Sequence, residues 1–185
     1  MKNGFLYGML LAVGFANLGD AKLLKTGSNI QPGLGQRKQV VLGEGGNTLD
    51  MAIAMLETND MTTKYPYHDN KSGDAANYGI FKQNFYMLRT CCTDFLKFTA
   101  EDYKEGDILN TDLKKDISCR HQCEEKYGYD VWFAGHRNGE NGVHDPKTDD
   151  IQDYKDAVAW IKSQLESDPK YLSDDTRFWV EVGAI

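Results

Sequence analysis

Two carboxyl side chains close together in the sequence, Glu57 and Asp69, are well suited to acid–base chemistry. Glu57 follows an apolar run, so burial and the negative end of a helix dipole should both disfavour its anion and raise its pKa. Asp69 lies in a polar segment beside Lys71, where solvent and an ammonium group favour the ionised form. Singly, each is more often an ordinary helix end or turn residue. Together, in opposed environments, they predict a general acid and a general base.

A central helix is predicted to position Glu57. Asn47 can cap a helix that runs from about Thr48 to Glu57, with Asp50 in its first turn. Nearly every residue between Asp50 and Glu57 is apolar, which indicates a helix buried on all sides.

A small antiparallel hairpin is predicted to position Asp69. After Glu57 the pattern becomes β-type, with strands expected at 61–65 and 77–81 and a turn at 71–74. Such a hairpin beside the helix would set Asp69 across a groove from Glu57.

The segment from Asn77 to Asn84, NYGIFKQN, resembles the hairpin strand of animal lysozymes. In those enzymes the catalytic glutamate lies upstream on a buried helix, and an acidic residue precedes Tyr-Gly-Ile. The corresponding position here is Asn77, which cannot serve as that carboxylate.

The whole stretch from Glu57 to Asn84 resembles glycoside hydrolase family 134 more closely, and a shorter similarity covers residues 132–139, WFAGHRNG. This resemblance implies a lysozyme-like fold and an endo-acting β-1,4-mannanase that inverts the anomeric configuration. The acid and base of that family match Glu57 and Asp69. An inverting pair needs about 6.5 to 9.5 Å between its carboxyl groups, which leaves room for a water molecule.

Six further residues are candidates for contact with a sugar: Lys71, Asn77, Gln83, Trp132, His136 and Arg137. The first three offer donors and acceptors for hydroxyl groups, although Asn77 and Gln83 could equally stabilise the sheet. The last three could form the far wall of the groove. For Trp132 a place in the core is an equally good interpretation, since aromatic platforms and core aromatics look alike in sequence.

No cofactor and no metal are predicted. His68, His121 and His144 show no ligand spacing and are interpreted as surface residues. Residues 145–149 lack the glycine and terminal glutamate of a calcium loop. A glycine-rich nucleotide-binding motif is also missing from the sequence.

The four cysteines form two close pairs: Cys91 with Cys92, and Cys119 with Cys123. Side chains of adjacent residues point apart, so each of the first pair is expected to bridge to one of the second pair. The connectivity stays open. A zinc site is the alternative, but adjacent cysteines make a poor zinc knuckle.

The rest of the chain predicts a mainly helical α+β domain over residues 22–185. Residues 22–47 are expected to form loop and short strand. Helices are expected near 84–92, 94–104, 111–126 and 150–168, and a strand near 177–182. In the last helix Ile151, Tyr154, Val158, Ile161 and Leu165 form one stripe, which predicts core contact.

The N-terminus predicts export. Lys2, an apolar run from Phe5 to Leu18 and a small-residue site ending at Ala21 are typical of a signal peptide over residues 1–21. A buried first helix is the alternative. Export and disulfides together indicate a secreted, extracellular protein.

Composition narrows the function further. The chain has 28 acidic and 21 basic residues and a net charge of −7, which argues against binding to nucleic acid. No apolar stretch reaches the length of a membrane span. We expect a monomer whose partner is a polysaccharide, β-mannan.

The sequence leaves two other function classes open: a lysozyme-like muramidase, and a non-catalytic carbohydrate-binding or inhibitor protein on the same scaffold. The asparagine at position 77 weakens the first, and the presence of both Glu57 and Asp69 argues against the second.

Asn70 is the asparagine of an N-x-[ST] sequon beside the expected base. A glycan there would crowd the groove, so we expect Asn70 to be unmodified in active protein.

Overall fold

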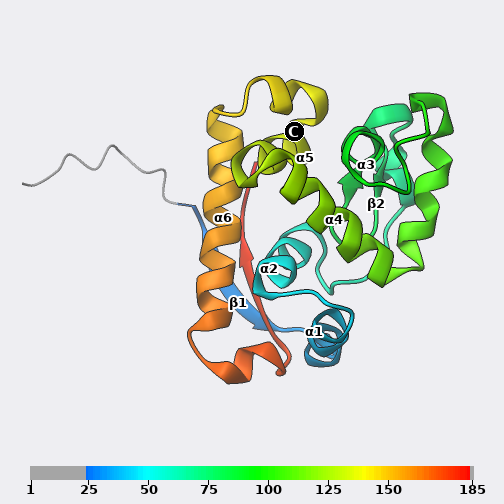
Figure 1. Ribbon diagram of the computed structural model, residues 1–185. Helices are drawn as coiled ribbons and strands as arrows, with labels where there is room; N and C mark the ends of the chain where they lie inside the picture. The colour runs from blue at the N-terminus through cyan, green and yellow to red at the C-terminus, as the bar shows by residue number, and fades with distance from the viewer. Residues whose placement is uncertain (1–23, 184–185) are drawn as a thin grey trace, which may run out of the picture.

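The buried helix α2 (Thr48–Glu57) lies at the centre of the computed structural model, which describes residues 24–183 (Figure 1). The Asn47 side chain accepts hydrogen bonds from the first-turn backbone, and Asp50 bonds back to the Asn47 backbone. The residues from Asp50 to Met55 are buried. The prediction of a capped central helix that ends at Glu57 is therefore confirmed.

One side of α2 is covered by the long helix α6 (Asp149–Glu166) and by an antiparallel strand pair (Figure 1). The pair consists of β1 (Thr26–Ile30) and β4 (Thr176–Val180), near the two ends of the described chain. The predicted stripe on α6 is buried, which confirms it as core. Helix α1 (Leu34–Gly43) and the 3₁₀ helix η4 (Pro169–Leu172) pack together beside this pair.

The other side carries the hairpin and the remaining helices. Strands β2 (Asn77–Tyr78) and β3 (Gln83–Asn84) pair antiparallel, and β3 runs directly into α3 (Phe85–Cys91). Two short 3₁₀ helices, η1 (Tyr67–Asn70) and η2 (Gly73–Ala75), precede the hairpin. The elements that follow are η3 (Ala100–Asn110), α4 (Leu113–Tyr127) and α5 (Tyr129–His144).

Two disulfides join the end of α3 to α4. They link Cys91 to Cys123 and Cys92 to Cys119. The prediction that each adjacent cysteine bridges to one member of the second pair is confirmed, and the connectivity is now defined. The bridges fix the helix that follows the hairpin.

The mainly helical α+β class is confirmed, but several predicted elements are wrong. Residues 61–65 form bends and loop instead of a strand, and the hairpin turn falls at 79–82 instead of 71–74. Residues 94–97 form turns, 98–99 are irregular, and a 3₁₀ helix replaces the rest of the helix predicted at 94–104.

Helix α1 lies within residues 22–47, where the sequence predicted loop and short strand, and α5 covers a glycine-rich stretch for which no element was predicted. In α1, a Cβ on Gly35 would collide with the backbone of Ser173. In α5, a Cβ on Gly135 would collide with Met87, and one on Gly142 with the backbone of Ala134. These glycines permit close approach of the chain at each position.

The predicted signal peptide, residues 1–21, lies outside the described residues. Within residues 24–183, none of the helices combines the length and apolar character needed to cross a bilayer.

Candidate active site

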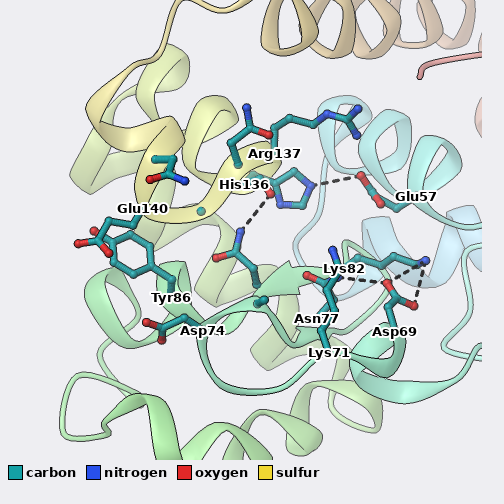
Figure 2. Close-up of a pocket in the computed structure, with 15 residues that line it drawn as sticks. Glu57, Asp69, Lys71, Asp74, Asn77, Lys82, Tyr86, His136, Arg137 and Glu140 are labelled. Atoms are coloured by element: carbon teal, nitrogen blue, oxygen red, sulfur yellow. Dashed lines mark hydrogen bonds and ion pairs between the residues drawn. The ribbon is translucent and has the colours of Figure 1, made fainter. Parts of the chain in front are cut away.

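A polar groove of about 780 Å³ lies between the end of α2, the η1–hairpin segment and α5 (Figure 2). Both predicted carboxyl residues, Glu57 and Asp69, line it. The other lining residues are Lys71, Asp74, Ala75, Asn77, Lys82, Asn84, Tyr86, His136, Arg137, Asn138, Gly139, Glu140 and Asn141. The structure thus brings the two carboxyl groups to one groove rich in hydrogen-bonding side chains.

The Glu57 carboxyl group contacts two residues from helices that lie far from it in the sequence. The hydroxyl of Tyr154, on α6, donates to Oε1 of Glu57 at 2.5 Å. Nε2 of His136, on α5, lies 3.3 Å from the same oxygen and 3.0 Å from the Tyr154 hydroxyl. The three side chains form a closed triangle at the inner side of the groove.

The electrostatic surroundings of Glu57 differ from the prediction. Burial by itself raises the pKa of Glu57, as the sequence suggested. The hydrogen bond and charge of His136, the Tyr154 hydroxyl and the charge of Lys82 outweigh burial and lower the pKa below its usual value. The expectation of a raised pKa in the unliganded protein is therefore wrong. The sequence did not reveal these partners, because His136, Tyr154 and Lys82 lie far from Glu57 along the chain.

Asp69 is presented by a turn in an uncommon backbone conformation. His68, Asp69 and Asn70 all have positive φ angles, of 65°, 47° and 59°. Histidine, aspartate and asparagine are the non-glycine residues that tolerate this region best. Three such residues in succession indicate a backbone shaped to present one side chain, a feature that clusters at functional sites.

The Asp69 carboxylate is fixed by Asn77 and Lys82. Nδ2 of Asn77 donates to Oδ2 of Asp69 at 3.1 Å, and Nζ of Lys82 lies 3.3 Å from the same oxygen. The Lys82 ammonium also lies over the ring of Tyr65, 4.7 Å from its centroid. The hairpin therefore supplies both groups that orient Asp69 (Figure 2).

Four of the six predicted sugar contacts lie at the groove, and two do not. Lys71, Asn77, His136 and Arg137 line it. Gln83 and Trp132 are each 1 % exposed and do not line it, so the prediction that they contact a ligand there is not supported. Trp132 instead stacks on the His136 ring, with 5.1 Å between centroids, as the alternative core interpretation suggested.

Gln83 stabilises the hairpin, the other role considered for it. Its Nε2 donates to Oδ1 of the buried Asp116 at 2.7 Å, and the backbone N–H of Ile80 donates to Oδ2. Burial raises the pKa of Asp116 to about 8. Gly79, with φ +73°, has no room for a Cβ against this carboxyl group. Asp116 thereby anchors the turn that carries Lys82.

The groove continues past α3 to a second cluster of polar residues. Arg89 forms a bidentate pair with Asp74, at 2.5 and 2.6 Å, and its guanidinium group lies 5.4 Å from the Tyr86 ring. Glu140, beside the kink at Gly139 in α5, lies near Tyr86 (Figure 2). The groove therefore extends beyond the two carboxyl groups of Glu57 and Asp69.

Sequence reasoning missed Lys82 and Tyr154 as site residues. Tyr154 is the polar member of the apolar stripe on α6, and a tyrosine in a buried stripe usually finds a partner for its hydroxyl. Lys82 lies within residues 57–84, the segment that resembles glycoside hydrolase family 134, and is its last cationic residue. Neither signal specified a contact with a carboxyl group.

The three residues interpreted as surface histidines lie outside this groove. His68 pairs with Asp107, and His121 with Asp50. His144 is exposed near Glu140. Among residues 24–183, no cluster of three or more histidine, cysteine or acidic residues is arranged to hold a metal ion.

A partly exposed glutamate and an aspartate that share a polar groove form the kind of site with which glycoside hydrolases cleave sugars. The family model described as glycosyl hydrolase family 134 matches residues 35–182, which cover most of the chain. The chain belongs to this family, a family of β-mannanases, and is a glycoside hydrolase. No curated protein matches it.

Proposed function

We propose that this glycoside hydrolase is a secreted endo-β-1,4-mannanase that inverts the anomeric configuration, with Glu57 as general acid and Asp69 as general base. Its membership of glycosyl hydrolase family 134 supports the substrate. The observation that carries the roles is that Glu57 and Asp69 line the same groove from separate elements, α2 and η1.

In this reaction Glu57 gives its proton to the glycosidic oxygen as the bond to the anomeric carbon breaks. Asp69 removes a proton from the water that attacks that carbon from the opposite face. Asn77 and Lys82 hold the Asp69 carboxylate during this step. The amide and ammonium groups of Asn138, Asn141 and Lys71 are suited to bind sugar hydroxyls along the groove.

Substrate class is tested by comparing linear β-1,4-mannan with bacterial cell walls. The proposal predicts release of reducing ends from mannan and no clearing of cell walls. Clearing of cell walls without hydrolysis of mannan would identify a muramidase instead.

The catalytic roles are tested with Glu57→Gln and Asp69→Asn. Each variant should lose roughly 10²-fold to 10⁴-fold in rate, the contribution of a general acid or base. A non-catalytic binding protein would retain binding of mannan and show no hydrolysis in any form. Wild-type rates in both variants would contradict the assigned roles.

Secretion and the monomeric state are also part of the proposal. Two disulfides suit an oxidising compartment, which supports secretion. Expression of the full chain in a secreting host should yield extracellular protein that begins after Ala21, as N-terminal sequencing would show. Light scattering should give the mass of one chain.

A further inference from the structure

The bonding pattern around Glu57 distinguishes its two carboxyl oxygens. Tyr154 and His136 both bind Oε1, whereas no described residue is seen to hydrogen-bond to Oε2. Glu57 is about one fifth exposed, and its side chain points into the groove (Figure 2). Oε2 is therefore the oxygen that a ligand in the groove can reach.

The positions of the hydrogens follow from the same contacts. A tyrosine hydroxyl has one proton, and Tyr154 gives it to Oε1 of Glu57. The hydroxyl oxygen can then act as acceptor for Nε2 of His136, 3.0 Å away, so this nitrogen carries a hydrogen. Oε1 already accepts the Tyr154 hydrogen and lies 3.3 Å from Nε2 of His136, whereas Oε2 has neither contact, so these contacts favour Oε2 as the oxygen that carries the proton of a neutral Glu57.

We propose that His136 and Tyr154 are positioning residues for Glu57. They bind Oε1 so that the transferable proton is carried on Oε2, and they stabilise the carboxylate that remains after the proton has left. This inference rests on the proposed role of Glu57 as general acid.

The surrounding structure holds the two positioning residues in place. The His136 ring lies parallel to the indole of Trp132, with 6° between the planes, and its side chain is 4 % exposed. Tyr154 is 2 % exposed on α6. Neither residue can turn away from Glu57 without disturbing the core.

Other charged groups near Glu57 come from three elements. Lys82 in the hairpin turn lowers the pKa of Glu57, and Asp69 in η1 is paired with Lys82. Arg137 on α5 lies over the Tyr154 ring, 5.5 Å from its centroid. These groups are unchanged in His136 and Tyr154 variants, so a change in the titration of Glu57 can be assigned to the substituted side chain.

The test is a titration of the Glu57 carboxyl group by ¹³C NMR in the unliganded protein, in wild type, His136→Gln and Tyr154→Phe. Both substitutions remove a group that lowers the pKa, so the midpoint should move to higher pH. The shift should be larger for His136→Gln, because the hydrogen bond and charge of His136 lower the pKa of Glu57 more than the Tyr154 hydroxyl does. The alkaline limb of the pH profile of kcat/KM on mannan should move in the same direction.

His121→Gln is the matched control. His121 also pairs with a carboxylate on α2, that of Asp50 at 2.9 Å, but at the opposite end of the helix. It should leave the Glu57 midpoint unchanged. Near-ultraviolet circular dichroism checks that each variant is folded. If His136→Gln does not fold, the Glu57 midpoint in Tyr154→Phe still tests the inference.

Wild-type midpoints in both variants would overturn the inference, even if the protein hydrolyses mannan. Shifted midpoints in a protein that leaves mannan intact would support the positioning of the carboxyl group and refute the proposed function.

Discussion

Nζ of Lys82 lies 3.3 Å from Oδ2 of Asp69, and its charge also lowers the pKa of Glu57. One ammonium group from the hairpin turn thus acts on both carboxyl groups of the proposed reaction. The hairpin does more than form one wall of the groove, because it supplies the cation that both carboxylates face.

Replacing Lys82 should impair the reaction more than binding. In Lys82→Gln the Asp69 carboxylate loses its ion pair, and a displacement of about 1 Å can cost up to roughly 100-fold in rate. Steady-state kinetics on mannan should show the loss mainly in kcat, with Lys82→Arg recovering part of it. Lys97→Gln, an exposed lysine outside the groove, is the control. An unchanged kcat in Lys82→Gln would exclude a role for this ion pair.

Asp116 should make the protein less stable as pH rises. In the unfolded chain an aspartate loses its proton near pH 4, whereas burial raises the pKa of folded Asp116 to about 8. Between these values the folded state holds the extra proton, so its contribution to the free energy of unfolding falls as pH rises, by at most about 1.4 kcal/mol per pH unit.

Urea unfolding between about pH 5 and pH 8 tests this expectation. The fall in stability should be smaller in Asp116→Asn than in wild type, while the exposed Asp145→Asn should behave like wild type. Equal slopes in wild type and Asp116→Asn would show that Asp116 is ionised when folded.

The disulfides should contribute stability without taking part in the reaction. Cys92 and Cys119 are 27 residues apart, and a cross-link of that span stabilises a fold by roughly 3 kcal/mol. The double variant Cys92→Ser/Cys119→Ser should lose less than this, because the Cys91–Cys123 bridge still closes nearly the same loop in the unfolded chain. Because neither residue lines the groove, its kcat below the melting temperature should match wild type. Unchanged stability would contradict the expectation.

Asn70 should be free of glycan in active protein. It is exposed in the turn that presents Asp69, and the next residue, Lys71, lines the groove. Intact-mass analysis of the secreted enzyme should give the unmodified mass, and Asn70→Gln should retain wild-type kcat. Complete occupancy of the sequon together with full activity would show that the groove is misplaced.

The local part of the site could be predicted from sequence. The cap at Asn47 and the apolar run that follows specify α2 and place Glu57 at its end, because helix capping and burial act over neighbouring residues. The pairing pattern of the cysteines followed from the opposite directions of adjacent side chains.

The hydrogen-bond partners of Glu57 on other helices could not be predicted. His136 and Tyr154 are 79 and 97 residues away from it in the sequence, on helices whose packing the pattern does not specify. The sequence of α2 reveals the desolvation of Glu57 but not these donors, which is why the predicted direction of its pKa was wrong.

The proposal that Glu57 and Asp69 form an inverting pair is tested most directly by ¹H NMR during the first turnovers on linear β-1,4-mannan. With an inverting pair, the new reducing ends appear first as the α-anomer and then mutarotate to the equilibrium mixture. Initial appearance of the β-anomer would mean retention of configuration and would contradict the assignment of Asp69 as a base that activates water.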